Sequence, residues 1–351
     1  MMRNEQQRLI TSLLNWYDCH GRTLPWRVRN GLGDPYKVWL SEVMLQQTTV
    51  VTVQPYFKEF IKRWPSLKAL ANAELDDVLH AWQGLGYYTR AHNLHKCAKI
   101  ILVKYEGKFP DNEEDLIRLP GIGSYTAAAI AAIAFGRPSA PVDGNIVRVI
   151  SRLMNLQTPL PALRLEVNSL FAPIVPINRP GDFVQAIMDL GATICLPRNL
   201  KCGQCPWFQF CAGQKYDKAE KLPVRAPKKK KPTRRGVVFW LENTAGKILL
   251  RRRPEKGLLG GMMEFPSTDW REKAWDVEEA TKMAPFNVKW HPLLGTVHHT
   301  FTHFNLELTV FLGHTGLKQE WLDVWSRPEY FANYALPTLM KKIAKHVSLA
   351  S

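Results

Sequence analysis

Apolar residues recur at helical spacing through the first two thirds of the chain. Between Leu67 and Trp82 they stand mostly three or four residues apart, which is the period of a helix with one buried face. The alanine-rich run 126–135 is followed by Gly136, and glycine is the residue that most often ends a helix. Proline and glycine residues separate such segments. The pattern predicts that residues 5–224 are mostly helical.

After residue 235 the pattern changes to short apolar runs of the kind that form β-strands. Three runs predict strands, at residues 236–241, 247–250 and 306–312. We also predict a turn at residues 243–246 and a helix around residues 272–283. The second part of the chain is therefore predicted to be a smaller α+β domain.

These changes divide the chain into three parts. Residues 1–224 form the predicted helical region, and residues 236–345 form the predicted α+β domain. Between them, residues 225–235 contain four consecutive lysines flanked by prolines. That composition is typical of a solvated linker, and it is also compatible with DNA contact.

The chain of 351 residues has 47 Lys and Arg against 31 Asp and Glu, a formal net charge of +16. Such an excess favours a polyanionic partner, and we place nucleic acid ahead of an anionic membrane surface. The first twenty residues lack the apolar core of a secretion signal, and no apolar run reaches the ~18 residues that span a bilayer. We therefore expect an intracellular protein, cytoplasmic and nucleoid-associated if bacterial, whose clustered cysteines bind metal.

Four cysteines lie within one short segment, spaced C-x6-C-x2-C-x5-C: Cys195, Cys202, Cys205 and Cys211. Four thiolates so close in sequence can bind a tetrahedral zinc ion or an iron–sulfur cluster. Zinc ribbons usually have two separated cysteine pairs, and the apolar residues in this loop favour a dry cluster site. A structural zinc ion is the alternative.

The segment Leu119–Ala127 contains two glycines that are candidates for phosphate binding, Gly121 and Gly123. Glycine lets the backbone pass close to a phosphate, and the free N–H groups at the start of the following helix attract that anion. Such contacts position a protein on DNA without reading its sequence.

Two carboxylates are candidates for acid–base chemistry. Glu42 is the only acid in the apolar helical stretch 37–48, so partial burial should raise its pKa, unless it faces solvent. Asp143 precedes a helical run, where it is either an N-cap or an ionised carboxylate held by the helix N-terminus. Two carboxyl groups with separated pKa values are the usual means of breaking glycosidic bonds.

Together these motifs resemble the endonuclease III–MutY superfamily of helix-hairpin-helix base-excision glycosylases. The segment S-E-V-M-L-Q-Q-T at residues 41–48, with the segments 24–27 and 82–88, resembles the MutY, or adenine glycosylase, branch. The resemblance implies a two-lobed, mostly α glycosylase domain with a [4Fe-4S] cluster on the four cysteines. It also implies that Glu42 protonates adenine N7 and that Asp143 is the catalytic aspartate.

The same resemblance implies further site residues. Tyr125 stands where bifunctional lyases of the superfamily have a lysine that forms a Schiff base, so the chain should hydrolyse the bond with water, assisted by Tyr125 and Asn145. Four residues should fill the gap left in the DNA when the base is flipped: Gln47, Thr48, Leu85 and Tyr87. Gln185 and Asp189, one helical turn apart, are expected to line the base pocket.

The C-terminal part resembles the Nudix-like domain of the MutY branch, and residues 251–266 match its glycine-rich turn. Glu278 and Glu279 remain of the catalytic Nudix helix, but the glycine of that motif is missing, so we expect no nucleotide hydrolysis. Residues 298–303 read as a polar hairpin loop, and three of them match a Phe-Ser-His loop of the branch: Phe301, Thr302 and His303. The resemblance implies that this loop reads 8-oxoguanine.

We therefore predict a monomeric enzyme of base-excision repair. Its predicted partner is duplex DNA that contains adenine opposite 8-oxoguanine or guanine, and no membrane is involved. The alternatives are a bifunctional glycosylase/lyase of the endonuclease III type, a non-catalytic iron–sulfur DNA-binding protein and a Nudix hydrolase. Tyr125, the two carboxylates and the incomplete Nudix helix argue against each in turn.

Overall fold

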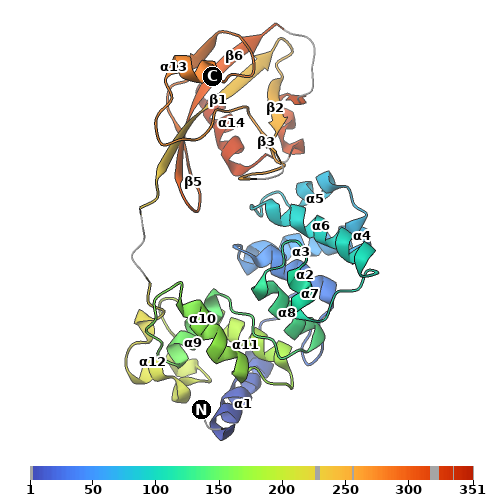
Figure 1. The fold of residues 1–351 in the computed structure, drawn as a ribbon, viewed down its shortest axis with the longest axis vertical. Coiled ribbons are helices and arrows are strands. Elements are labelled where there is room, and N and C mark those ends of the chain that lie inside the picture. The colour runs from blue at the N-terminus through green and yellow to red at the C-terminus, as the bar shows by residue number, and fades with distance from the viewer. Residues whose placement is uncertain (1–2, 226–229, 255–256, 317–323, 335, 351) are drawn as a thin grey trace. The chain divides into compact units, whose positions relative to one another are not determined.

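The computed structural model of the chain describes residues 3–225, 230–254, 257–316, 324–334 and 336–350 (Figure 1). Residues 226–229 of the predicted linker, and residues 255 and 256 of the glycine-rich turn, lie outside these ranges. The chain folds into two compact units. One consists of residues 1–73 and 92–227, and the other of residues 74–91 and 228–351.

The predicted helical character of residues 5–224 is confirmed (Figure 1). The α-helices of this part are α1 (Arg3–His20), α2 (Pro35–Leu45), α3 (Val50–Arg63), α4 (Leu67–Ala71), α5 (Leu75–Ala81), α6 (Thr89–Lys104), α7 (Glu113–Ile117), α8 (Ser124–Phe135), α9 (Gly144–Leu153), α10 (Leu163–Phe171), α11 (Pro180–Thr193) and α12 (Ala212–Lys215). No helix in the described ranges is long and apolar enough to cross a bilayer.

A hairpin joins α7 to α8, as the glycine pattern predicted. Gly121 has a φ of 78°, and a Cβ there would lie 2.8 Å from the Cβ of Asn93, so only glycine fits. Gly123 is the N-cap of α8, and Gly136 ends this helix in the left-handed conformation. The alanine-rich helix between them is buried along most of its length, so it forms a central support for the helices around it.

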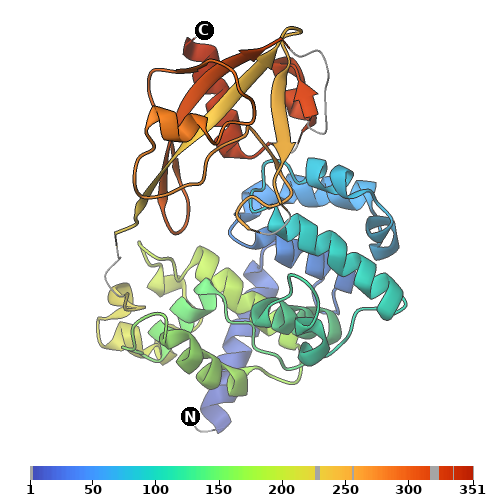
Figure 2. The same cartoon turned by 45° about the horizontal axis from the view of Figure 1, so that its top comes forward.

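The C-terminal part contains a mixed seven-stranded sheet with the order β3-β2-β1-β6-β4, in which β5 pairs with β6 and β7 with β2. The strands are β1 (Thr233–Asn243), β2 (Ile248–Arg252), β3 (Met263–Glu264), β4 (Trp290–Pro292), β5 (Val297–Thr300), β6 (Asn305–Thr315) and β7 (Val324–Ser326). Apolar clusters cover both faces of the sheet, one of them with residues of α14 (Thr338–Ala350). The hairpin of β5 and β6 projects from the body of the sheet (Figures 1 and 2).

The three predicted strands and the predicted turn are confirmed, but two boundaries are wrong. Thr233–Arg235, assigned to the linker, are the first residues of β1, where Arg235 pairs with Glu307 of β6 at 2.9 Å. A helix around residues 272–283 forms only as α13 (Val277–Thr281). It starts late because residue 271 is held extended against β1 and Asp276 provides the N-cap.

Candidate active site

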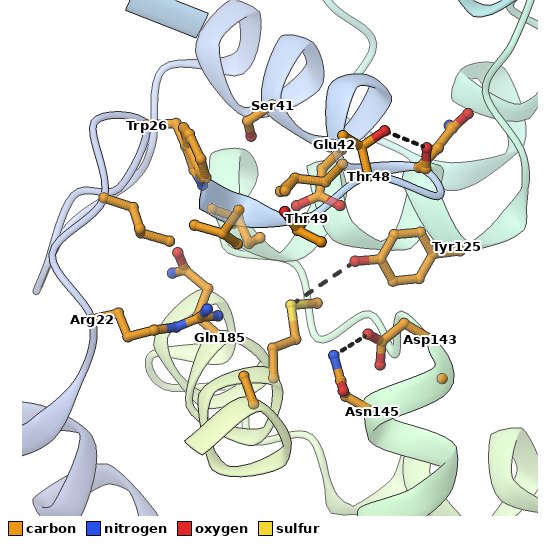
Figure 3. Close-up of a pocket in the computed structure, with 18 of the residues that line it drawn as sticks. Arg22, Trp26, Ser41, Glu42, Thr48, Thr49, Tyr125, Asp143, Asn145 and Gln185 are labelled. Carbon is orange, nitrogen blue, oxygen red and sulfur yellow. Dashed lines mark hydrogen bonds between the residues drawn. The ribbon is translucent and has the colours of Figure 1, made fainter. Parts of the chain in front are cut away.

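A pocket of about 610 Å³ lies in the helical unit, between α2, α8, α9 and α11 (Figure 3). Side chains from segments far apart in the sequence line it, and Figure 3 shows that Glu42, Tyr125 and Asp143 face the same space from three helices. Its volume is within the usual range for small-molecule sites, which suits one extruded nucleobase.

Glu42 lies on α2 among other buried residues of this helix and is only 7% exposed, as its apolar surroundings in the sequence predicted. Burial raises the pKa of Glu42 to about 7, and the nearby Asp143 acts in the same direction. A hydrogen bond with Tyr125 and the charge of Arg27 oppose the shift. A protonated carboxyl group is therefore available near neutral pH, as a general acid requires.

Asp143 is the N-cap of α9, and it also lines the pocket. One carboxylate oxygen accepts a hydrogen bond from the backbone N–H of Ile146 at 2.6 Å, and the other accepts one from Asn145 Nδ2 at 2.9 Å. Burial raises the pKa of Asp143, although these hydrogen bonds oppose the rise. The N-cap that the sequence indicated is therefore present, and the same side chain also lines the pocket, while its catalytic role stays a prediction.

Tyr125 extends from α8 toward the space between the two carboxylates (Figure 3). Its hydroxyl group donates to the Met188 sulfur at 3.9 Å and also interacts with Glu42. Burial and both acids raise the pKa of Tyr125 well above its ordinary value, so the phenol stays neutral. A neutral hydroxyl can donate a hydrogen bond in the pocket but cannot form an imine.

An ion-pair cluster beside the pocket was not foreseen. Asp189 does not line the pocket, which corrects its predicted place; it is fully buried and accepts hydrogen bonds from Arg22 and Arg27 at 2.6–2.9 Å. Burial opposes its ionisation, but the bond from Arg27 and the charges of both arginines lower the pKa of Asp189 below its ordinary value. Gln185 does line the pocket, with its Nε2 held by the Gly181 carbonyl at 3.0 Å.

Arg148 connects the catalytic candidates to the cysteine segment. Its Nη2 donates to Asn145 Oδ1 at 2.8 Å, and its Nε donates to the Cys195 carbonyl at 2.8 Å. Asn145 in turn donates to Asp143. The backbone of the first cysteine is therefore three hydrogen-bonded steps from the pocket carboxylate.

The four cysteines of the short segment line one small, mostly apolar cavity. Arg152, which is buried, donates to the Cys195 sulfur at 3.3 Å and to the Leu196 carbonyl at 2.7 Å. No three His, Cys, Asp or Glu side chains in the described ranges are grouped so as to hold a single metal ion. One tetrahedral zinc ion needs sulfurs about 3.8 Å apart, given Zn–S bonds of about 2.3 Å, whereas a four-iron cluster takes each thiolate on a different iron.

The predicted DNA contacts are placed as follows. Gln47 is exposed with a φ of 60° and Thr48 is half-buried, and both line the pocket in the helical unit. Tyr87 is 56% exposed with a φ of 48°, whereas Leu85 is buried, and both belong to the second unit. Gln47 and Tyr87 therefore present side chains to solvent, and Leu85 does not.

The tip of the β5–β6 hairpin holds the residues that we predicted to read the lesion. Thr302 and His303 are exposed, and Phe301 is half-buried with its ring 5.8 Å from that of Trp270. Part of the predicted loop is in fact strand, since β5 runs to Thr300 and pairs there with Asn305. The turn is therefore shorter than the sequence indicated.

Comparisons with known proteins agree with this architecture. Residues 40–169 match the family model of the HhH-GPD superfamily base excision DNA repair protein, and residues 237–346 match that of the NUDIX domain. The structure of a thermostable thymine-DNA glycosylase aligns with a TM-score of 0.54 and 27% identity, over 61% of this chain and 98% of that one. A non-covalent endonuclease III–DNA complex aligns with a TM-score of 0.51 and 22% identity, over 62% and 98%, and supports the fold.

Curated relatives cover most of the chain. The adenine DNA glycosylase of Buchnera aphidicola subsp. Schizaphis graminum is 38% identical over 304 residues, which are 86% of each chain. The human adenine DNA glycosylase is 35% identical over 95% of this chain and 72% of its own length. These matches confirm the predicted fold class and the predicted resemblance. The chain belongs to the adenine DNA glycosylase family.

Proposed function

We propose that this protein removes adenine from duplex DNA where adenine is paired with 8-oxoguanine or guanine, by hydrolysis of the N-glycosidic bond. The observation that carries the proposal is the meeting of Glu42, Tyr125 and Asp143 in one pocket of about 610 Å³. Two carboxyl groups with a neutral phenol between them supply an acid and a stabilising charge. They supply no amine nucleophile.

The reaction follows from the two carboxyl groups. Protonated Glu42 gives its proton to adenine N7, so the electron pair of the C1′–N9 bond can leave with the base. The positive charge that develops on the sugar lies beside Asp143, whose carboxylate stabilises it. Water then adds to C1′ and passes its proton to a carboxylate, which leaves free adenine and an abasic site. Asn145 keeps Asp143 oriented through the 2.9 Å hydrogen bond.

The hydrolytic assignment predicts the outcome of borohydride trapping. Because Tyr125 stands where a lyase would have its lysine, reduction during the reaction should trap no efficient covalent complex of protein and DNA. Tyr125→Lys tests whether an amine at this position is sufficient to create one. Robust trapping by the unmodified protein would move the assignment to the bifunctional lyases.

We propose a [4Fe-4S] cluster as the cofactor, held by the four cysteines around the apolar cavity. Their convergence, and a guanidinium group bonded to one sulfur, fit thiolate ligands of a cluster. The cluster would shape the basic loop that carries Arg198 and Lys201 for DNA contact. The steps at the sugar and at the base depend on the pocket side chains.

The cluster proposal predicts the metal content. Purified protein should be coloured and contain about four irons per chain, the stoichiometry of a cubane. Cys205→Ser should lose iron, whereas Cys19→Ser, which changes an exposed cysteine outside the cavity, should keep it. Stoichiometric zinc without iron would contradict the proposal.

Duplex DNA is the proposed partner of both parts of the chain. The hairpin at Gly121 and Gly123 suits a phosphate, because α8 begins there without a side-chain cap. Gln47, Thr48 and Tyr87 are proposed to contact the DNA beside the flipped base, and Tyr87, the aromatic residue among them, is 56% exposed. Leu85 was predicted to act with them, but it is buried in this structure and is not proposed as a contact. The C-terminal domain, residues 236–345, is proposed to read the base opposite.

The loop Phe301–His303, which we call the reading loop, is proposed to recognise 8-oxoguanine. That base differs from guanine by an O8 acceptor and an N7–H donor, and the exposed Thr302 and His303 can bond to this edge. Thr302→Ala and His303→Ala should each lower the preference for 8-oxoguanine over guanine by about 5-fold or more, the scale of a base-edge contact. His314→Ala, an exposed histidine on the adjacent β6, is the control. An unchanged preference in both loop variants would place recognition elsewhere.

A further inference from the structure

The reading loop rests on a column of aromatic rings. Phe301 stacks on Trp270 with the ring centroids 5.8 Å apart and the planes at 25°. Phe304, at the end of the turn, lies 4.9 Å from Phe301 and 6.3 Å from Trp270. Thr302 and His303 therefore lie between Phe301 and Phe304 in the sequence, and the rings of both phenylalanines pack near Trp270.

Trp270 is itself fixed from several sides. The backbones of residues 235 and 271 exchange two hydrogen bonds, which hold the neighbouring residue against β1. A Cβ at Gly236 would lie 2.7 Å from Trp270 Cδ1, so the ring packs flush on the strand. The guanidinium group of Arg253 also lies 5.4 Å from the centroid of the Trp270 ring.

The glycine-rich segment of residues 251–266 holds Arg253 in place beside Trp270. Arg253 forms an ion pair with Glu264, which is buried, and donates to the Leu258 carbonyl at 3.0 Å. Arg251 pairs with the same carboxylate at 2.8 Å. The segment that matches the Nudix turn therefore holds the arginine that covers Trp270, and through it supports the reading loop.

A second anchor comes from the end of the linker. Lys231 Nζ donates to the Phe301 carbonyl at 2.8 Å, and the Phe301 N–H donates to the Phe304 carbonyl at 2.9 Å. Both backbone groups of Phe301 are therefore hydrogen-bonded, which restrains the start of the turn that carries Thr302 and His303. Such preorganisation spares the cost of ordering a loop when a ligand binds.

We propose that Trp270 and Lys231 are positioning residues for lesion discrimination: they hold the reading loop in the conformation that meets the damaged base. The inference rests on the proposed reading of 8-oxoguanine by this loop. Neither side chain touches the base. Their effect should therefore appear in the choice between 8-oxoguanine and guanine, and not in adenine hydrolysis itself.

The test compares single-turnover efficiency, the rate constant divided by Kd, on duplexes with adenine opposite 8-oxoguanine or opposite guanine. Trp270→Leu should lower the ratio of the two efficiencies about tenfold, within the range of one base-edge contact. Activity opposite guanine should stay within about twofold, and Trp270→Phe should restore most of the ratio because a ring remains for stacking. Trp325→Leu is the matched control, since Trp325 lies on β7 and packs with the other apolar cluster, against Phe286.

Lys231→Met gives an independent arm that leaves the aromatic column intact. It removes the donor to the Phe301 carbonyl and should lower the ratio about threefold, as expected for the loss of one solvent-exposed hydrogen bond. Lys342→Met is its control, because Lys342 donates in the same way, at 3.0 Å, to the His298 carbonyl outside the loop. If thermal unfolding shows that Trp270→Leu is not folded, this arm decides the matter.

The outcomes separate the two proposals. If Thr302→Ala and His303→Ala lose the preference while both Trp270→Leu and Lys231→Met keep it, the reading loop stands and the positioning role is wrong. If the loop variants also keep the preference, the lesion is read elsewhere and both proposals fail. Equal losses in Trp270→Leu and Trp325→Leu would show a general structural effect and would likewise overturn the positioning role.

Discussion

Glu42→Gln should lower adenine excision by about 10²–10⁴-fold, the usual contribution of a general acid. Glutamine keeps the shape of the side chain in its buried position, but it has no proton to give to adenine N7. DNA binding should change little, because the side chain is 7% exposed and faces the pocket. Single-turnover rates on a duplex with adenine opposite 8-oxoguanine measure the effect.

The pH dependence adds a second signature of the same group. Since the pKa of Glu42 is raised to about 7, the rate of the unmodified protein should fall as pH rises through that value. A folded pKa above the unfolded one also means that this carboxyl group stabilises the fold at low pH and that the contribution is lost as pH rises through about 7. Glu42→Gln should remove both dependences, whereas Glu59→Gln, at an exposed position on α3, should keep them. A near-normal rate in Glu42→Gln would rule out the acid role.

Asp143→Asn should lower excision by about 10²–10³-fold, the scale on which a preorganised electrostatic partner acts. Asparagine caps helices about as well as aspartate, so the hydrogen bond to the Ile146 N–H can persist while the charge is lost. Stability should therefore change little, which separates catalysis from folding. Asp34→Asn makes the same change at the N-cap of α2 and should leave excision unaffected.

Thermal unfolding and single-turnover excision, measured together, distinguish the two roles of Asp143. A large loss of stability in Asp143→Asn with full activity in the folded fraction would reduce Asp143 to a structural cap. The expected result is the opposite: a stable protein that binds DNA and releases adenine very slowly.

Local patterns predicted most of the fold. The alanine-rich helix with its terminal glycine, and the apolar runs that became β1, β2 and β6, all carry their structure in adjacent residues. β5 was missed because its sequence is not apolar: only Val297 is buried, and the strand forms because β6 provides a partner. β3, β4 and β7 have only two or three residues each, which is too few to form a recognisable pattern. The helix at 277–281 is shorter than predicted because pairing of residue 271 with β1 competes with helix formation.

The same distinction between local and distant interactions applies to the candidate site. Glu42 and Asp143 could be identified because their burial and capping depend on immediate neighbours. The ion pairs of Asp189 could not, since Arg22 and Asp189 are 167 residues apart and meet only in the folded unit. The sequence showed only that Asp189 is an acidic residue within the apolar run 183–192, and this pattern suggested a pocket residue. In the structure Asp189 is fully buried and does not line the pocket. The same holds for Arg148 and Cys195, which are 47 residues apart.

The two parts of the chain divide the proposed task. The helical unit holds the acid, the stabilising carboxylate and the cysteine cavity, so it carries the chemistry on adenine. The C-terminal domain carries the reading loop and the residues that hold it, so it carries the choice of the opposite base. Variants of the first kind should change the rate on every substrate, and variants of the second kind should change the ratio between substrates.

The most direct test offers the protein four duplexes in competition and identifies the released base by mass spectrometry. The duplexes hold a single adenine opposite 8-oxoguanine, adenine opposite guanine, cytosine opposite 8-oxoguanine, or an oxidised pyrimidine opposite guanine. We predict free adenine from the first duplex, slower release of adenine from the second, and no base from the other two. Release of the oxidised pyrimidine, or no adenine from the first duplex with fully iron-loaded protein, would contradict the account.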